Sequence, residues 1–248
     1  MLGRILIFLA ALAVWLIVLL PLKTVAIAAG GADRLGYQDV FGTVWNGRVY
    51  GLELAGEPVR EIALSMRPAA LLTGQAAADW LIEDASLSGN GRIALGAGRV
   101  EVSGASLVVP LSRLAAADWP GMDPGEPVFV RLPRLVFVDG DCRQADGAVR
   151  TGALVTLGAA YGFEGPVLEG GLSCRDGVLA LAMRGETDAL SVTADADLRA
   201  NGYDWRVTAR TGNADLADAL ALAGFEAGID TDGDVWHAQG SGRYDGND

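Results

Sequence analysis

Short alternating runs of apolar and polar residues, separated by glycine, asparagine and aspartate, constrain the fold of this chain most strongly. In residues 191–198 every second residue is apolar, which gives an extended strand one dry face and one wet face. Comparable runs cover residues 48–54, 59–67, 85–95, 99–109, 128–138, 149–157, 166–173, 177–184, 203–211 and 234–244. The pattern predicts a mainly β, antiparallel domain that is either curled or sandwich-like.

Helices are expected to be few and short. Pro68 suits the first turn of a helix over residues 68–72, which Gly74 ends. A second helix is predicted over residues 110–117. A third is predicted over residues 214–223, with Asn213 as its N-cap and Gly224 after its end.

The N-terminus predicts a membrane segment. Residues 5–20 are uniformly apolar, and the run extends through Pro21 to Leu22. A bilayer-spanning helix needs about 20 apolar residues, so 5–22 suffices with snorkelling by Arg4 and Lys23. The alternative is a signal peptide cut after residues 26–28, but its apolar stretch is usually shorter. We expect an uncleaved transmembrane helix that leaves the bulk of the chain outside the cytoplasm.

The domain organisation follows from this segment. We expect an anchor over residues 1–30 and a β domain over 31–248. The proline- and glycine-rich stretch 119–126 would divide the β domain into halves 31–119 and 126–248, unless it is only a long turn.

Composition excludes several functional classes. The chain is 51% apolar, which rules out an intrinsically disordered protein. Residues 1–30 contain two basic residues and no acid, so the remainder holds 17 basic and 31 acidic residues, a net charge of −14. Such a surface repels phosphate backbones, and no nucleic-acid partner is expected.

No catalytic, cofactor-binding or metal-binding residues are predicted. The single histidine, His237, lies in a strand-like run without a nucleophile motif. The acidic stretch 230–234 resembles a calcium loop, but an EF-hand requires Gly and Glu where Val235 and Ser241 stand. We therefore expect a protein without enzymatic activity.

Two tryptophans are of interest. Trp45 and Trp80 each lie in an apolar run near a turn, where core packing is the favoured interpretation and contact with a partner or an acyl chain is the alternative. Next to Trp45, Asn46–Gly47 is the residue pair favoured in two-residue hairpins, and it predicts the turn there.

Cys142 and Cys174 are the only cysteines. In an exported chain they can oxidise to a disulfide, and two buried thiols are the alternative.

Two motifs resemble protein N of the type II (general) secretion pathway. The first is the Gly-Thr-Val-Trp-Asn-Gly stretch after the anchor; the second is a strand that leads into Pro and a Leu-Leu-x-Gly turn. The matching residues are Gly42, Thr43, Trp45, Gly47, Pro68, Leu71, Leu72 and Gly74. Met66 departs from the family, which usually has a second tryptophan there. The Cys142 to Gly177 segment, with Gly170, Gly171 and Cys174, is also similar.

The resemblance implies an accessory structural or interaction subunit of the type II secretion apparatus. Such a protein is single-pass in the inner membrane of a Gram-negative cell, with its bulk in the periplasm and other secretion components as partners. The family has no known catalytic residues. A looser architectural similarity to membrane-anchored envelope proteins makes lipid handling in an apolar β groove the runner-up. A cleaved soluble binding protein or hydrolase is the third alternative.

Overall fold

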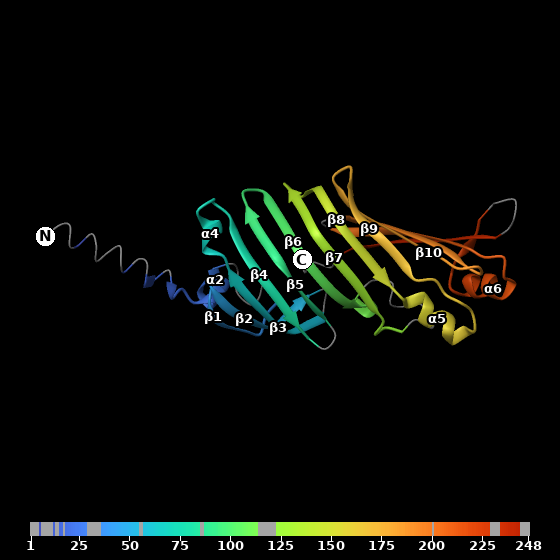
Figure 1. The fold of residues 1–248 in the computed structure, drawn as a ribbon, viewed down its shortest axis with the longest axis horizontal. Coiled ribbons are helices and arrows are strands. Elements are labelled where there is room, and N and C mark those ends of the chain that lie inside the picture. Colours follow the sequence, from blue (N-terminus) through green and yellow to red (C-terminus); the bar gives the residue numbers. More distant parts are fainter. Residues whose placement is uncertain are drawn as a thin grey trace.

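The protein forms one large antiparallel sheet. The computed structural model describes residues 5, 12, 15–16, 18–28, 36–54, 57–84, 87–113, 123–199, 201–228 and 234–243. Its 14 strands follow one another in chain order, except that β14 lies between β12 and β13. Figure 1 shows this curved, twisted sheet running from the first strands at one end to the last strands at the other.

The strands are β1 Asp39–Thr43, β2 Asn46–Leu54, β3 Glu57–Met66, β4 Ala76–Glu83, β5 Ser88–Gly96, β6 Arg99–Pro110, β7 Pro127–Val138, β8 Asp141–Thr151, β9 Leu168–Arg175, β10 Val178–Glu186, β11 Ser191–Arg199, β12 Gly202–Arg210, β13 Glu226–Ala227 and β14 Val235–Arg243. The helices are α2 Leu22–Ala28, α4 Pro68–Leu71, α5 Ala153–Tyr161 and α6 Ala214–Leu222, with a 3-10 turn η1 at Leu111–Arg113.

The mainly β fold with few short helices is confirmed, but the sandwich-like alternative is wrong because every strand among the described residues belongs to one open sheet. β6 and β7 pair from Pro110↔Pro127 to Arg99↔Val138, so the sheet continues across the suggested boundary 119–126. Half of the expected membrane segment, nine of residues 5–22, lies outside the described residues. Among those that are described, no helix has the length and apolar character needed to cross a bilayer.

The two rims of the sheet differ. Odd-numbered strands from β1 to β11 end at one rim, the hairpin rim, where two-residue turns such as Asp139–Gly140 and Asp176–Gly177 connect the strands. The opposite rim, the helix rim, carries η1, α5 and α6 in its longer connections. In Figure 1, α5 and α6 lie along this rim, and α4 lies at the hairpin rim near the N-terminal end.

The helix predictions were right for α4 and α6 and wrong for residues 149–157. The Asn213 side chain accepts hydrogen bonds from the backbone N–H groups of Asp215 and Leu216 and caps α6 as expected. The expected strand 149–157 instead ends at Thr151 and turns into α5. Gly152 precedes α5 and has no side chain for a capping hydrogen bond, and the Thr151 hydroxyl accepts from the Ala153 N–H at 3.3 Å instead. Residues 114–117 of the predicted helix 110–117 lie outside the described residues.

One face of the sheet, the inner face, is apolar from strand to strand. Following cross-strand partners gives one uncharged row with a residue from each strand from β1 to β12 and from β14. This first apolar row is Val40, Val49, Ile62, Ile82, Gly89, Leu107, Val130, Val149, Gly170, Met183, Ala194, Val207 and Ala238.

The helices cover this face at the helix rim. Leu154 of α5 and Leu216 of α6 form a buried cluster with Val192, Ala209 and Phe225. A second cluster joins Leu111 of η1 and Ala153 to Val128 and Val149. A third lies under the first strands around Val59, Ile62, Ile82 and Leu87. The core is therefore a layer between one sheet face and the segments of a single rim.

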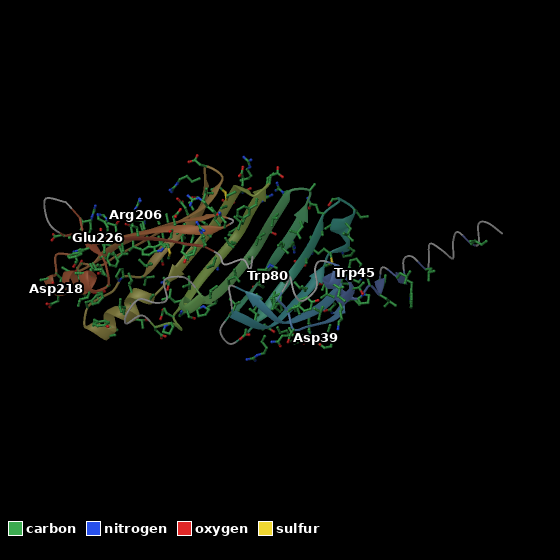
Figure 2. All side chains as sticks on the ribbon, turned by 180° about the vertical axis from the view of Figure 1, so that it is seen from behind. Asp39, Trp45, Trp80, Arg206, Asp218 and Glu226 are labelled. Carbon is green, nitrogen blue, oxygen red and sulfur yellow. A yellow bond between two sulfur atoms is a disulfide. The ribbon has the colours of Figure 1, made fainter. Side chains whose placement is uncertain are left out.

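The opposite, outer face carries the charged side chains, although Phe41, Leu81 and Phe129 also lie on it and are 57%, 42% and 49% exposed. One of its rows runs Arg150, Glu169, Arg184, Thr193, Thr208 and His237 across β8 to β14. Figure 2, seen from behind, places Arg206 on the strands at the end of the sheet far from the N-terminal segment. The charged side chains thus lie on the outer face, and the apolar row on the inner face contains none. This difference between the faces agrees with the alternation seen in the sequence.

Candidate functional site

The motif residues meet at one corner of the sheet, where the hairpin rim meets the first strands. We call this region the motif corner: the β1–β2 turn with Gly42–Gly47, residues 66–74 with α4, and residues 20–28. Figure 2 shows Asp39 and Trp45 at this end, from which the N-terminal segment leaves. These segments are distant in sequence, and backbone hydrogen bonds join them.

The β1–β2 turn is held by partners on both sides. Thr43 pairs with Asn46, so the turn residues are Val44 and Trp45. The Val44 N–H donates to the Leu20 carbonyl at 3.0 Å, and the Val44 carbonyl accepts from the Met66 N–H at 3.2 Å. The predicted Asn46–Gly47 turn is therefore wrong, because hydrogen bonds to two distant segments place the reversal two residues earlier.

Two positions of the motif require glycine, each for a different reason. Gly42 has a φ of +87°, a conformation that side chains rarely adopt, and a Cβ there would also overlap the Asn46 carbonyl. Gly47 has ordinary backbone angles, but a Cβ at this position would overlap the Leu22 side chain of α2 and lie 2.8 Å from the Thr43 carbonyl oxygen. Gly47 thus leaves room for α2 on the sheet.

α2 is docked on the first strands. Pro21 forms an isolated antiparallel bridge with Thr43, and α2 begins at the next residue. The Lys23 ammonium lies 3.9 Å from the Asp39 carboxylate, which adds an exposed ion pair of small energetic weight. The end of the expected membrane segment, together with α2, is therefore attached to the sheet by backbone hydrogen bonds and side-chain packing.

α4 presents two leucines to solvent at this corner. Pro68 occupies its first turn, and Gly74, with a φ of +73°, follows it. The exposed fraction is 48% for Leu71 and 89% for Leu72. α4 starts two residues after Met66, whose N–H is bonded to Val44. The leucines of the motif are thus exposed close to the point where residues 20–21 join the sheet.

The structure distinguishes the two tryptophans. Trp80 lies on the inner face of β4 and packs against the cluster around Val59 and Ile62. Its ring covers Gly91 on β5, where a Cβ would lie 2.8 Å from Cζ2 of the indole. Trp45 lies in the turn and, like Trp80, is half-buried, but it belongs to none of the buried clusters of the described residues, while its neighbour Val44 is buried. Core packing therefore describes Trp80 and Val44 better than Trp45.

Next to α4, a carboxylate on the outer face lies between two arginines. Asp79 on β4 accepts from Arg92 Nε at 2.7 Å and from Arg67 Nε at 2.9 Å. Burial alone would raise the pKa of Asp79, but hydrogen bonding and charge attraction from Arg92 and then Arg67 lower this pKa below its ordinary value. On β2, a hydrogen bond with Tyr50 and the Glu61 carboxylate raise the pKa of Arg48.

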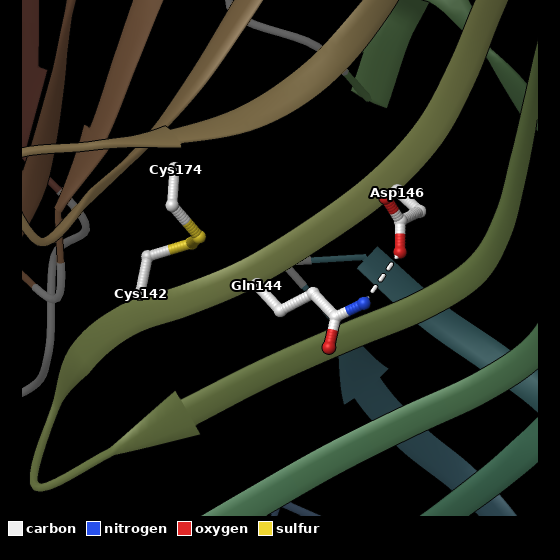
Figure 3. The surroundings of a disulfide bond; sticks show 4 residues. All are labelled: Cys142, Gln144, Asp146 and Cys174. Carbon is white, nitrogen blue, oxygen red and sulfur yellow. Dashed lines mark hydrogen bonds between the residues drawn. A yellow bond between two sulfur atoms is a disulfide. The ribbon is translucent and has the colours of Figure 1, made fainter.

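The two cysteines form a disulfide on the inner face. Cys142 and Cys174 have Cα atoms 5.4 Å apart and join β8 to β9. Backbone pairing between these strands runs only from Thr151↔Leu168 to Gly147↔Leu172. Figure 3 shows the bond bridging the two ribbons, with the Gln144–Asp146 hydrogen bond nearby. The disulfide connects the strands beyond the end of their ladder.

His237 lies on the outer face. Its Nδ1 is 3.1 Å from the Thr208 hydroxyl, and Glu226 is its cross-strand partner on the other side. The side chain is exposed on a continuous ladder, and backbone N–H groups that pair strands are not free to stabilise an oxyanion. Within the described part of the chain, no group of His, Cys, Asp and Glu could hold a metal ion. The predicted acidic loop 230–234 lies outside the described residues except for Asp234.

Sequence reasoning located the motif residues but missed what joins them. The backbone contacts of Leu20, Val44 and Met66 carry no side-chain signal. The apolar inner face was easier to predict than these contacts, since alternation within a strand indicates which residues share a face.

Comparison with protein families gives one match over most of the chain. The family model described as type II secretion system (T2SS), protein N, matches residues 33–231. This span includes the sheet from β1 to β13. Comparison with curated proteins and with solved structures gave no match.

Proposed function

Because the chain belongs to the type II secretion system protein N family, we propose that it serves the secretion machinery as a non-catalytic structural and interaction subunit. In this proposal residues 5–22 hold it in the inner membrane and its sheet lies in the periplasm. The family match over 33–231 is the observation that carries the proposal.

The N-terminal junction supports an uncleaved anchor. A cut after Ala28 would remove α2, the Pro21↔Thr43 bridge and the carbonyl that accepts from Val44. Val44 is 3% exposed in the intact chain, so its N–H would lose its partner at a buried position. A chain that keeps these contacts keeps its apolar N-terminal segment as well.

Two features support an interaction role. The motif corner gathers the family motif at one exposed place without a catalytic cluster among the described residues. At the far end of the sheet, β13 pairs only with Trp236 and His237, and no other described strand pairs with β14 on that side. An open strand edge can bind an extended segment of another protein by backbone hydrogen bonds.

The test is deletion of the gene and re-expression of the full-length chain. We expect deletion to reduce the extracellular level of secreted enzymes and to leave them folded inside the envelope. Re-expression should restore secretion, and the intact chain should co-purify with other secretion components and resist carbonate extraction from inner membranes. Unchanged secretion after deletion, or a soluble form that begins at Ala29, would contradict the proposal. Neighbouring secretion genes would support it independently.

Lipid handling is the second candidate function. The exposed part of the apolar inner face favours it: Leu95 is 46% exposed and Val100 is 37% exposed, and neither belongs to a buried cluster of the described core. Phospholipid that co-purifies with the chain would support this function, whereas lipid-free protein would argue against it.

A further inference from the structure

The inner face carries a second apolar row, and this one lies near the hairpin rim. Cross-strand pairs and the disulfide link Ala76, Leu95, Val100, Phe137, Cys142, Cys174, Leu179, Leu198, Tyr203 and Gly242 in order from β4 to β14. No residue of this row is charged, although the chain contains 19 basic and 31 acidic residues. The tyrosine hydroxyl is its one hydroxyl group.

This second row is more open than the face at the helix rim. The buried clusters that include η1, α5 and α6 contain no residue of the second row. Leu95 is 46% exposed and Val100 is 37% exposed, although both lie on the apolar side of the sheet. Phe137, Leu179, Leu198 and Tyr203 are half-buried, and Cys142 in the middle of the row is 3% exposed. Packed helices therefore close one rim, and an apolar strip lies along the other.

We propose that this strip, from Leu95 to Tyr203, binds the acyl chain of a phospholipid. This inference rests on lipid handling, the second candidate function, and does not depend on the secretion role. Neighbouring strands lie about 4.8 Å apart, so the row from β4 to β14 extends for about 40 Å. One leaflet of the bilayer hydrocarbon is about 15 Å thick, half of the ~30 Å core, so an extended chain fits along the strip.

The chemistry of the strip favours hydrocarbon over polypeptide. A polypeptide in an extended conformation would bury backbone N–H and C=O groups against a surface that offers almost no partners, at a large energetic cost. An acyl chain has no such groups, and burying it is favourable in proportion to its area.

The position of the face also fits this ligand. The first apolar row begins at Val40 on β1, next to the segment where Pro21 bridges to Thr43. If residues 5–22 span the bilayer, the inner face starts at the membrane surface and continues away from it along the sheet.

Photocrosslinking in cells tests the inference directly. p-Benzoylphenylalanine would replace Leu198 on the inner face or Asp195 on the outer face of the same strand, β11, in the full-length chain. Cells grown with radioactive phosphate would be irradiated, and the purified protein analysed by gel and mass spectrometry. We expect a phospholipid adduct at Leu198 at least about tenfold stronger than at Asp195, which corresponds to about 1.4 kcal/mol in preference.

A matched pair of charge substitutions provides the second readout. Ala196→Asp places a carboxylate on the inner face between Leu181 and Trp205, and Ala182→Asp places one on the exposed outer face. The first should abolish the adduct at Leu198, and the second should leave it unchanged. Protease resistance and the intact disulfide would report folding in both variants.

Three results would overturn the inference. The first is a phospholipid adduct of equal strength at Leu198 and Asp195, which would show only that the sheet lies close to the membrane. Another is an adduct to protein at Leu198, which means a polypeptide occupant. The third is no adduct at Leu198 in folded protein. Secretion in the deletion strain is measured separately, so failure of lipid binding and failure of the secretion role remain distinguishable.

Discussion

Cys142 of β8 is bonded to Cys174 of β9 where these two strands have already stopped pairing through their backbones. Their last paired residues are Gly147 and Leu172, so the disulfide bridges a split in an otherwise continuous sheet. The Cys142 N–H also donates to the Gly177 carbonyl in the β9–β10 turn at 2.7 Å. The covalent bond thus secures the second apolar row at the point where the ladder is weakest.

Removing this bond should destabilise the domain. Replacing both cysteines with serine should lower the free energy of unfolding by about 3–4 kcal/mol, because the closed loop restricts the unfolded chain. Urea denaturation of the full-length protein in detergent measures this change. Hydrogen exchange should accelerate in residues 141–146 more than in 147–151, which pair with β9. An unchanged urea midpoint would contradict the structural role of the bond.

Gly47→Ala should loosen α2 from the sheet. The added Cβ overlaps the Leu22 side chain and approaches the Thr43 carbonyl, and overpacking of this kind costs about 1–3 kcal/mol. We expect faster proteolysis between residues 20 and 38 in addition to the loss of stability. Gly171→Ala is the control, since its Cβ would have only an ordinary contact at 3.4 Å. Equal effects of the two variants would argue against docking of α2 at Gly47.

Trp80→Ala should destabilise the protein more than Trp45→Ala does. The Trp80 indole packs in the first-strand cluster and covers Gly91, so its removal leaves a cavity and should cost about 3 kcal/mol. Trp45 is half-buried in a turn that backbone hydrogen bonds hold, and we expect a smaller loss. Thermal unfolding of both variants gives the comparison. If Trp45→Ala stays folded while secretion fails, Trp45 is a partner contact in the sense of a hot spot.

Asp79→Asn should change how stability depends on pH. Arg92 and Arg67 hold the pKa of the folded carboxyl below its ordinary value of 3.8. The stabilisation is therefore present above the unfolded pKa and is lost as pH falls through the lower folded pKa. The variant should be less stable at pH 7 by under about 1 kcal/mol, because the ion pairs are exposed, and its stability should fall less steeply below about pH 4.

Urea midpoints between pH 2 and pH 7 measure this difference. Asp188→Asn, at an exposed loop carboxylate that makes no ion pair within the described residues, is the control and should leave the urea midpoint at pH 7 unchanged. If the stability of Asp79→Asn depended on pH as that of the wild-type protein does, this would contradict the role assigned to Arg67 and Arg92.

Leu72 and Leu222 test the orientation of the sheet relative to the membrane. Both leucines are 89% exposed, but Leu72 lies at the motif corner and Leu222 on α6 at the far end. A fluorophore sensitive to polarity can be attached at Leu72→Cys or Leu222→Cys, since the native cysteines are bonded to each other. In phospholipid vesicles the full-length chain should show increased, blue-shifted emission at Leu72 only. An equal response at both positions, or at Leu222 alone, would contradict anchoring through residues 5–22.

Patterns within single segments of sequence determined the local features of this protein. Alternation in runs such as 191–198 specifies which residues share a face, because side chains alternate along a strand whatever its neighbours are. Asn213 specifies the start of α6 through its own side chain. In β6, β7 and β8, however, the two apolar rows lie an odd number of residues apart, so bulges in the ladder, and not alternation alone, keep both rows on the inner face.

Tertiary structure alone decided how these strands and turns combine. Alternation does not state whether an apolar face packs on a second sheet or on helices, and here α5 and α6 cover one rim of a single sheet. The turn at Val44–Trp45, in place of Asn46–Gly47, depends on backbone hydrogen bonds to Leu20 and Met66. Such bonds use groups that every residue has, so no residue type marks them, and only the folded chain brings the partners within reach.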